Sequence, residues 1–170
     1  MFIALLLFHI KFRNITKGDA IPRIISPKPK YVLVVFADDV KTEAMKVVQR
    51  IRSETGFETL TVKEIKERYV DGRAEVDNRA EAVNGAIKLV VIPSPMLFQS
   101  DNLMSMVNMA MVPYGKVVPI FVRKCTYITS ALGSLTPIDL TQDYGEESFV
   151  QFLQVLKGTQ KKGEKGRCQK

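Results

Sequence analysis

Residues 31–39 read YVLVVFADD, an unbroken apolar run rich in β-branched side chains that ends in two acidic residues. A strand that is apolar on both faces is typical of the centre of a parallel sheet covered by helices on each side. Similar runs follow as IKLVVI at 87–92 and KVVPIFV at 116–122, and we expect shorter strands at 59–62 and 137–140. The sequence therefore predicts five strands, three of them fully buried.

Helical patterns separate these strands. Apolar side chains recur at helical spacing at 44–51, more weakly at 76–83, and again at 100–111 and 146–156. The polar stretch 63–73 is predicted to be a loop. Strands that alternate with helices indicate an α/β fold with a five-stranded, mostly parallel sheet and helices on both faces.

The formal charge of +7 is concentrated at the two ends of the chain. Residues 1–30 and 157–170 each hold six basic residues and one acidic residue, which leaves residues 31–156 with a net charge of −3. We therefore expect no nucleic-acid-binding face on the folded body. The predicted organisation is a leader and linker at 1–30, one domain at 31–157 and a disordered basic tail at 158–170.

The composition also limits the chemistry. A Ser-His-Asp or Cys-His site would depend on His9, the only histidine, and two cysteines with one histidine cannot form a zinc site. No G-x-G-x-x-G or P-loop motif follows a predicted strand, so we expect no cofactor and no metal. The apolar run 1–10 is too short to span a bilayer, and a reduced cytoplasmic protein is expected. The pair Asp38-Asp39 is interpreted as capping the next helix or lining its loop.

Three stretches resemble the TIR domain family, the module of Toll-like receptors and their adaptors. YVLVVFADD at 31–39 is similar to the first TIR box. ERYVDGRAEVDNRAEAVNGAIKLVVIPSPMLFQS at 67–100 resembles the second box, its BB loop, the following helix and the next strand. Phe149-Val150 lies where the third box has Phe-Trp. The resemblance covers residues 30–157 and implies a flavodoxin-like, three-layer α/β fold.

Within that family, the TRIF/TRAM-type adaptor branch is the most similar. The segments Asp71-Gly72-Arg73, 82–85 and 107–111 carry this similarity, and the absence of tryptophan also suits the branch. One departure is Asp71, which stands where the family loop usually has proline.

The resemblance implies that the BB loop is a partner-binding surface. Its residues are Arg68, Tyr69, Val70, Asp71, Gly72 and Arg73. Arginine and tyrosine are enriched at the anchor points of protein interfaces, and Gly72 allows the backbone to turn. Met104 and Asn108, on the helix after the third strand, form a weaker candidate surface because Met104 falls off the expected core face.

Some TIR domains hydrolyse NAD with a glutamate on this same helix. Counting from Ser100, the expected N-cap, Met106 falls at the position of that glutamate, and residues 103–111 contain no carboxylate. Cleavage of a glycosidic bond needs an acidic group beside its oxocarbenium-like transition state. We therefore expect a non-catalytic adaptor that mediates TIR–TIR association in innate-immune, Toll-like receptor signalling.

The expected partners are other TIR domains, of a receptor or of an adaptor, and self-association stays open. One alternative is an NAD-hydrolysing TIR enzyme with a relocated carboxylate. Another is a module that binds an anionic membrane through its basic ends, which would place it next to a membrane.

Overall fold

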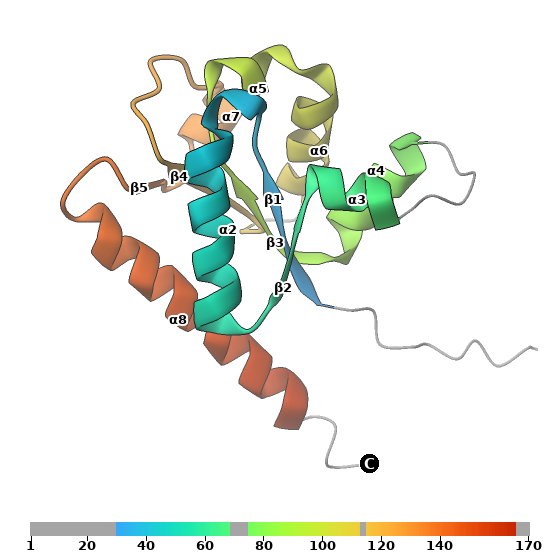
Figure 1. The fold of residues 1–170 in the computed structure, drawn as a ribbon, viewed down its shortest axis with the longest axis vertical. Coiled ribbons are helices and arrows are strands. Elements are labelled where there is room, and N and C mark those ends of the chain that lie inside the picture. Colours follow the sequence, from blue (N-terminus) through green and yellow to red (C-terminus); the bar gives the residue numbers. More distant parts are fainter. Residues whose placement is uncertain (1–29, 69–74, 113–114, 166–170) are drawn as a thin grey trace, which may run out of the picture.

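The computed structural model describes residues 30–68, 75–112 and 115–165 (Figure 1). Within these ranges the strands are β1 (Tyr31–Val35), β2 (Glu58–Thr61), β3 (Ala86–Val91), β4 (Val117–Phe121) and β5 (Ile138–Asp139). The helices are the short 3-10 helix η1 (Asp38–Val40), then α2 (Lys41–Thr55), α3 (Val62–Arg68), α4 (Glu75–Gly85), α5 (Pro95–Gln99), α6 (Asp101–Met111), α7 (Ser130–Gly133) and α8 (Gly145–Lys165).

The five strands form one sheet in the order β2-β1-β3-β4-β5, and every neighbouring pair is parallel. β1 lies between β2 and β3, with Leu33 opposite Leu60 on one side and Leu89 on the other. The predicted α/β fold of the flavodoxin-like type, with a five-stranded parallel sheet, is confirmed.

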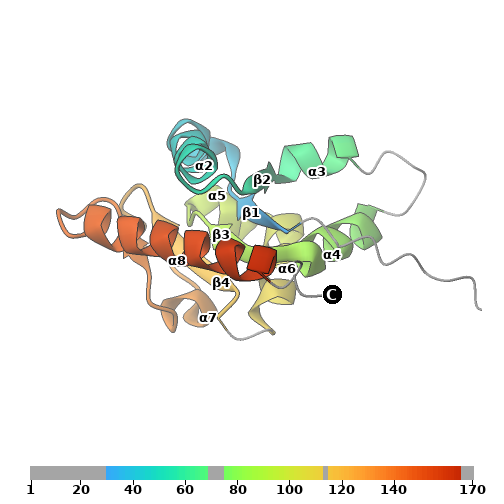
Figure 2. The same ribbon diagram turned by 90° about the horizontal axis from the view of Figure 1, so that it is seen from below.

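Two layers of helices cover the sheet, one on each face (Figure 1, Figure 2). Side chains of successive strand residues point to opposite faces. Leu33 and Val35 therefore join the core cluster beneath α4 and α6, whereas Val32 and Val34 join the cluster beneath α2 and α8. Phe149 of α8 is fully buried in this second cluster. The core thus lies on both faces of β1, as its continuous apolar sequence predicts.

The segment 63–73, predicted to be a loop, is helical where the structure describes it, because α3 spans Val62–Arg68. Thr61 and Glu64 form a reciprocal cap. The N–H of Thr61 donates to Glu64 Oε2 at 2.7 Å, and the N–H of Glu64 donates to Thr61 Oγ1 at 3.4 Å. A Thr-x-x-Glu pair of this kind satisfies free donors at a helix start. The buried side chain of Ile65 belongs to the core cluster on the side of α4 and α6, and it anchors α3 to that core.

Helix α8 continues past the predicted end of the domain, to Lys165. The predicted tail at 158–170 thus begins within α8, and residues 166–170 lie outside the described residues. Glutamine, lysine and glutamate, which make up most of residues 160–165, favour helix. None of the helices in the described ranges is long and apolar enough to cross a membrane.

Candidate functional site

A cleft of about 770 Å³ opens at the carboxyl edge of the sheet, beside the end of β1. After β1 the chain crosses to β2, and after the neighbouring β3 it crosses the other way to β4. Ligand sites of open α/β sheets form where the strand order reverses in this manner. The lining residues are Phe36, Ala37, Asp38, Lys41, Met45, Thr61, Val62, Lys63, Glu64, Glu75, Arg79, Met96, Ser100, Asn102, Leu103 and Met106.

Helix α6 supplies one wall of this cleft. Ser100 accepts a hydrogen bond from the N–H of Leu103 at 3.4 Å, so it is the N-cap that the sequence predicts. This start turns Leu103 and Met106 toward the cleft. Met106 is fully buried and also belongs to the core beneath α6. Met106, the residue at which the TIR resemblance would place a glutamate, is thus a buried lining residue of the cleft.

A buried guanidinium joins α4 to α6 along the cleft. The side chain of Arg79 is 11% exposed, and its Nη2 lies 2.7 Å from Oε1 of Glu75, one turn earlier on α4. Its Nη1 donates to Oδ1 of Asn102 on α6 at 2.8 Å. Because a buried charge is costly without partners, these contacts fix how the two helices meet.

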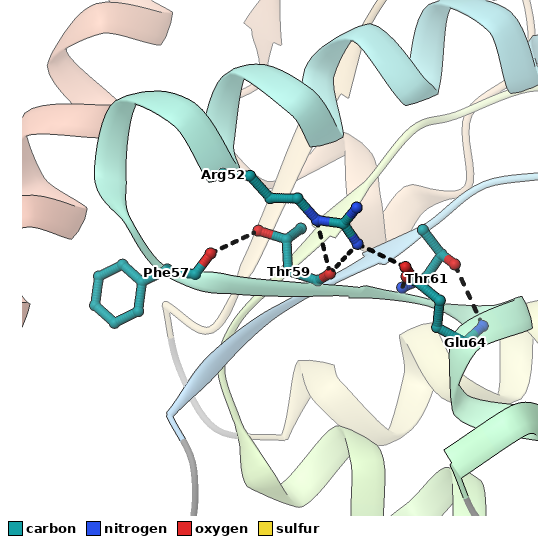
Figure 3. Close-up of polar contacts among 5 residues, drawn as sticks. All are labelled: Arg52, Phe57, Thr59, Thr61 and Glu64. Atoms are coloured by element: carbon teal, nitrogen blue, oxygen red, sulfur yellow. Dashed lines mark hydrogen bonds and ion pairs between the residues drawn. The ribbon is translucent and has the colours of Figure 1, made fainter.

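Glu64 forms the part of the wall that begins α3 (Figure 3). Its Oε1 lies 2.7 Å from Nη2 of Arg52, and its Oε2 accepts from the N–H of Thr61 at 2.7 Å. Burial raises the pKa of Glu64, but the hydrogen bonds from Arg52 and Thr61 outweigh burial and hold the pKa below its usual range. Glu64 is therefore an ionised carboxylate with both oxygens engaged.

The two acidic residues after β1 face different surroundings. Asp38 and Asp39 begin the helical turn η1, but the structure records no side-chain cap there, so the capping half of their interpretation is wrong. Asp38 lines the cleft. Asp39 Oδ1 instead accepts a hydrogen bond from Oγ of the buried Ser94 at 2.8 Å. Asp38 is thus the carboxylate of the pair that faces the cleft.

The cleft combines charged groups at its rim with an apolar floor. Lys41 and Lys63 are exposed beside it, and Phe36, Ala37 and Met106 are among its apolar lining residues. Its lining residues include no histidine and no cysteine. In the part of the chain that the structure describes, no three His, Cys, Asp or Glu side chains gather as metal ligands would. This arrangement can bind a polar molecule that has an apolar portion.

The predicted partner surfaces are only partly within the described residues. Arg68 is the last residue of α3, and Tyr69, Val70, Asp71, Gly72 and Arg73 lie outside the described ranges. Met104 is half-buried and packs against the core, so less of it is available to a partner than its position off the core face suggests. Asn108 is exposed. Neither Met104 nor Asn108 lines the cleft.

Sequence reasoning missed the polar wall of the cleft. Glu75 and Arg79 stand four residues apart, a spacing that favours an ion pair on a helix. Thr61 and Glu64 match the capping-box pattern. These signals were present in the sequence, but the contact between Arg79 and Asn102 depends on how α4 packs against α6.

Sheet order and helical layers together define a flavodoxin-like α/β domain. The fold is similar to the crystal structure of the TIR domain of the Toll-related receptor TRR-2 from Hydra magnipapillata, with a TM-score of 0.59 and 17% identity, over 72% of this chain and 93% of that one. It is also similar to the SEFIR domain of IL-17 receptor B, with a TM-score of 0.51 and 13% identity, over 75% of this chain and 98% of that one. No family model and no curated protein sequence matches the chain. At these identities the likeness concerns the fold, and the TIR-like fold expected from the sequence is confirmed.

Proposed function

We propose that this chain is a non-catalytic TIR-type adaptor of the TRIF/TRAM kind, which transmits an innate-immune signal in the cytoplasm by associating with other TIR domains. The observation that carries this proposal is Met106. It lines the cleft and is fully buried, so the helix that would hold the catalytic glutamate of an NAD-cleaving TIR domain offers a thioether there. The TIR-like fold supports the same function.

The proposed contact surface is the BB loop, from Arg68 to Arg73. Two arginines and a tyrosine would provide charge-assisted and aromatic contacts to an acidic partner surface. The loop joins α3 to α4, and residues of both helices line the cleft. Partner binding and the cleft would therefore occupy adjoining parts of the domain.

A pull-down against a panel of TIR domains tests this proposal. Reversing both loop charges (Arg68→Glu with Arg73→Glu), or Gly72→Asp, should reduce capture at least about ten-fold, as expected for the loss of interface anchors. The matched control reverses two exposed lysines on α2 and α8 (Lys46→Glu with Lys157→Glu) and should leave capture unchanged. Circular dichroism checks that each variant is folded. Equal capture by all variants would remove the loop from the proposal.

The cleft gives specific support to a second candidate, an NAD-hydrolysing enzyme with a relocated carboxylate. Asp38 and Glu75 both line it. Glu75 is paired with Arg79, whereas the side chain of Asp38 has no hydrogen-bond or ion-pair partner among the described residues. Asp38 is thus the carboxylate best placed to stabilise a positively charged sugar in the transition state.

Incubation of the purified protein with NAD separates the two candidates. The adaptor proposal expects no nicotinamide release above that of a buffer control. Turnover that survives repurification and is lost in Asp38→Asn would contradict it and establish the enzyme. A matching Asp39→Asn variant, changed at the carboxylate bonded to Ser94, controls for a general effect of removing an acid next to β1.

A further inference from the structure

Among the strands of the described residues, β2 lies at one end of the sheet, with β1 as its one neighbour. The free side of such a strand presents backbone donors and acceptors that can pair with a strand of another molecule. Thr59 and Thr61 are two residues apart, so their backbone groups point to the same side of β2. The structure shows side chains bonded to both of these residues.

Arg52 and Glu64 supply these bonds (Figure 3). The carbonyl oxygen of Thr59 accepts from Arg52 Nε at 3.2 Å and from Nη2 at 2.5 Å. The N–H of Thr61 donates to Glu64 Oε2 at 2.7 Å. Arg52 Nη2 and Glu64 Oε1 lie 2.7 Å apart, which joins the two side chains. Together they give β2 a donor and an acceptor two residues apart, as the backbone of a neighbouring strand would.

Of the two arginines Arg50 and Arg52 on α2, only Arg52 bonds the backbone of β2. Arg50 lies on the same helix and has its own ion pairs, to Glu54 at 3.1 Å and to Glu146 at 2.7 Å, but these partners are helical side chains. Arg52 reaches from α2 to β2, and Glu64 from the first turn of α3. Two helices that flank the strand therefore each send one charged side chain to it.

We propose that Arg52 and Glu64 together close the edge of β2 against strand addition, and that the partner they exclude is the β2 edge of a second copy of this chain. The strand reads ETLT, and threonine favours extended structure. Two copies related by a two-fold axis would present the same donors and acceptors to each other, which is the self-complementary arrangement of an edge-to-edge dimer. This closure is a property of the sheet edge and is independent of the proposed loop-mediated function.

Sedimentation velocity of the full chain tests the proposal. Arg52→Ala with Glu64→Ala opens the edge, and we expect its self-association to be at least about ten-fold tighter than that of the unchanged protein. The matched control is Arg50→Ala with Glu54→Ala, which removes an ion pair of the same helix and should associate like the unchanged protein. Glu64→Ala alone, which frees the Thr61 N–H, provides the same comparison if the double variant does not fold.

A charge-swapped variant separates edge closure from a merely structural ion pair. Arg52→Glu with Glu64→Arg keeps opposite charges side by side but sets a carboxylate against the Thr59 carbonyl. We expect it to associate as tightly as the double alanine variant. If the swap restores the behaviour of the unchanged protein, the ion pair is structural and the proposal is overturned.

Loop charge reversal then shows which surface associates. Adding Arg68→Glu and Arg73→Glu to the double alanine variant should leave the new association intact, because it uses β2. Loss of the association would place it at the loop and overturn the closure of the edge. Failure of the TIR pull-down, by contrast, concerns the loop surface and leaves the edge proposal standing.

Discussion

Two arginines in this domain each bond a glutamate on their own helix and a side chain on a neighbouring helix, but in different surroundings. Arg79 bonds a glutamate on its own helix, four residues away, and a side chain on the neighbouring helix α6. Arg50 likewise bonds Glu54 on its own helix and Glu146 on the neighbouring α8. The Arg79 side chain is 11% exposed and that of Arg50 is 35% exposed. The two arginines thus differ in burial and in the partner on the neighbouring helix, which is an amide for Arg79 and a carboxylate for Arg50.

Burial turns such contacts from an accessory into a requirement. An exposed pair exchanges hydration for a weak, screened attraction, and its net contribution is small. A buried guanidinium has already lost most of its water, so each bonding partner offsets part of the free-energy cost of that desolvation. Arg50 also lies 4.7 Å from the ring centroid of Phe149, which adds a modest cation–π attraction. We thus expect the α4–α6 contact to depend on its charges far more than the α2–α8 contact does.

The largest effect is expected from Glu75→Gln, which leaves Arg79 buried without its ionic partner. We expect the free energy of unfolding to fall by about 2 kcal/mol, below the range for fully buried pairs, because the carboxylate itself is 52% exposed. Urea denaturation followed by circular dichroism measures it. A loss below about 0.5 kcal/mol would show that the guanidinium does not need this carboxylate, and the comparison would fail.

The strands could be predicted from the sequence because a continuous run of apolar residues indicates a strand that is buried on both faces. Residues Tyr31–Val35 are all buried, and no amphipathic pattern competes with that assignment. Helix α3 could not be predicted in this way. It has seven residues, with Ile65 as its fully buried anchor, and its start depends on reciprocal bonds between Thr61 and Glu64. Hydrophobic periodicity does not predict such a helix, because its start is stabilised by polar capping bonds and not by a row of apolar side chains.

The cleft also has one part that could be predicted from the sequence and one part that could not. Met106 could be placed from a local count along one helix, starting at Ser100. The polar wall could not, because Arg79 and Asn102 are 23 residues apart and meet through the packing of α4 on α6. Spacing predicts the pair of Arg79 with Glu75, but it does not predict that this arginine is buried. Position along a helix is local information, whereas burial of a charge is a tertiary result.

The exposed counterpart, Glu146→Gln, should have a much smaller effect. The carboxylate is 60% exposed, and the change removes the ion pair with Arg50 but leaves Arg50 in contact with Glu54 and Phe149. We expect a loss of about 0.5 kcal/mol, within the usual range for exposed pairs. The same urea experiment measures it beside Glu75→Gln. Equal losses in the two variants would mean that burial is not what separates the two arginines.

The pH dependence of the exposed pair gives the smallest effect and sharpens the comparison further. The hydrogen bond from Arg50 holds the pKa of Glu146 below its usual range, against a small opposing effect of burial. A carboxyl with a lowered pKa in the folded state stabilises the fold above the pKa of the unfolded chain, about 4.3, and this contribution is lost as the pH falls through the folded pKa.

The stability difference between the unchanged protein and Glu146→Gln should therefore be constant from pH 7 to pH 5, shrink as the pH falls below about 4.3, and vanish once the pH is below the folded-state pKa, since glutamine does not titrate. It should also shrink in 1 M salt, because the Debye length there is about 3 Å and the pair is exposed to solvent. Urea denaturation of both proteins across this pH series measures it. A difference that does not shrink at all between pH 5 and pH 3 would have to come from packing of the side chain at the start of α8, and the ion pair with Arg50 would then carry no part of the contact between α2 and α8.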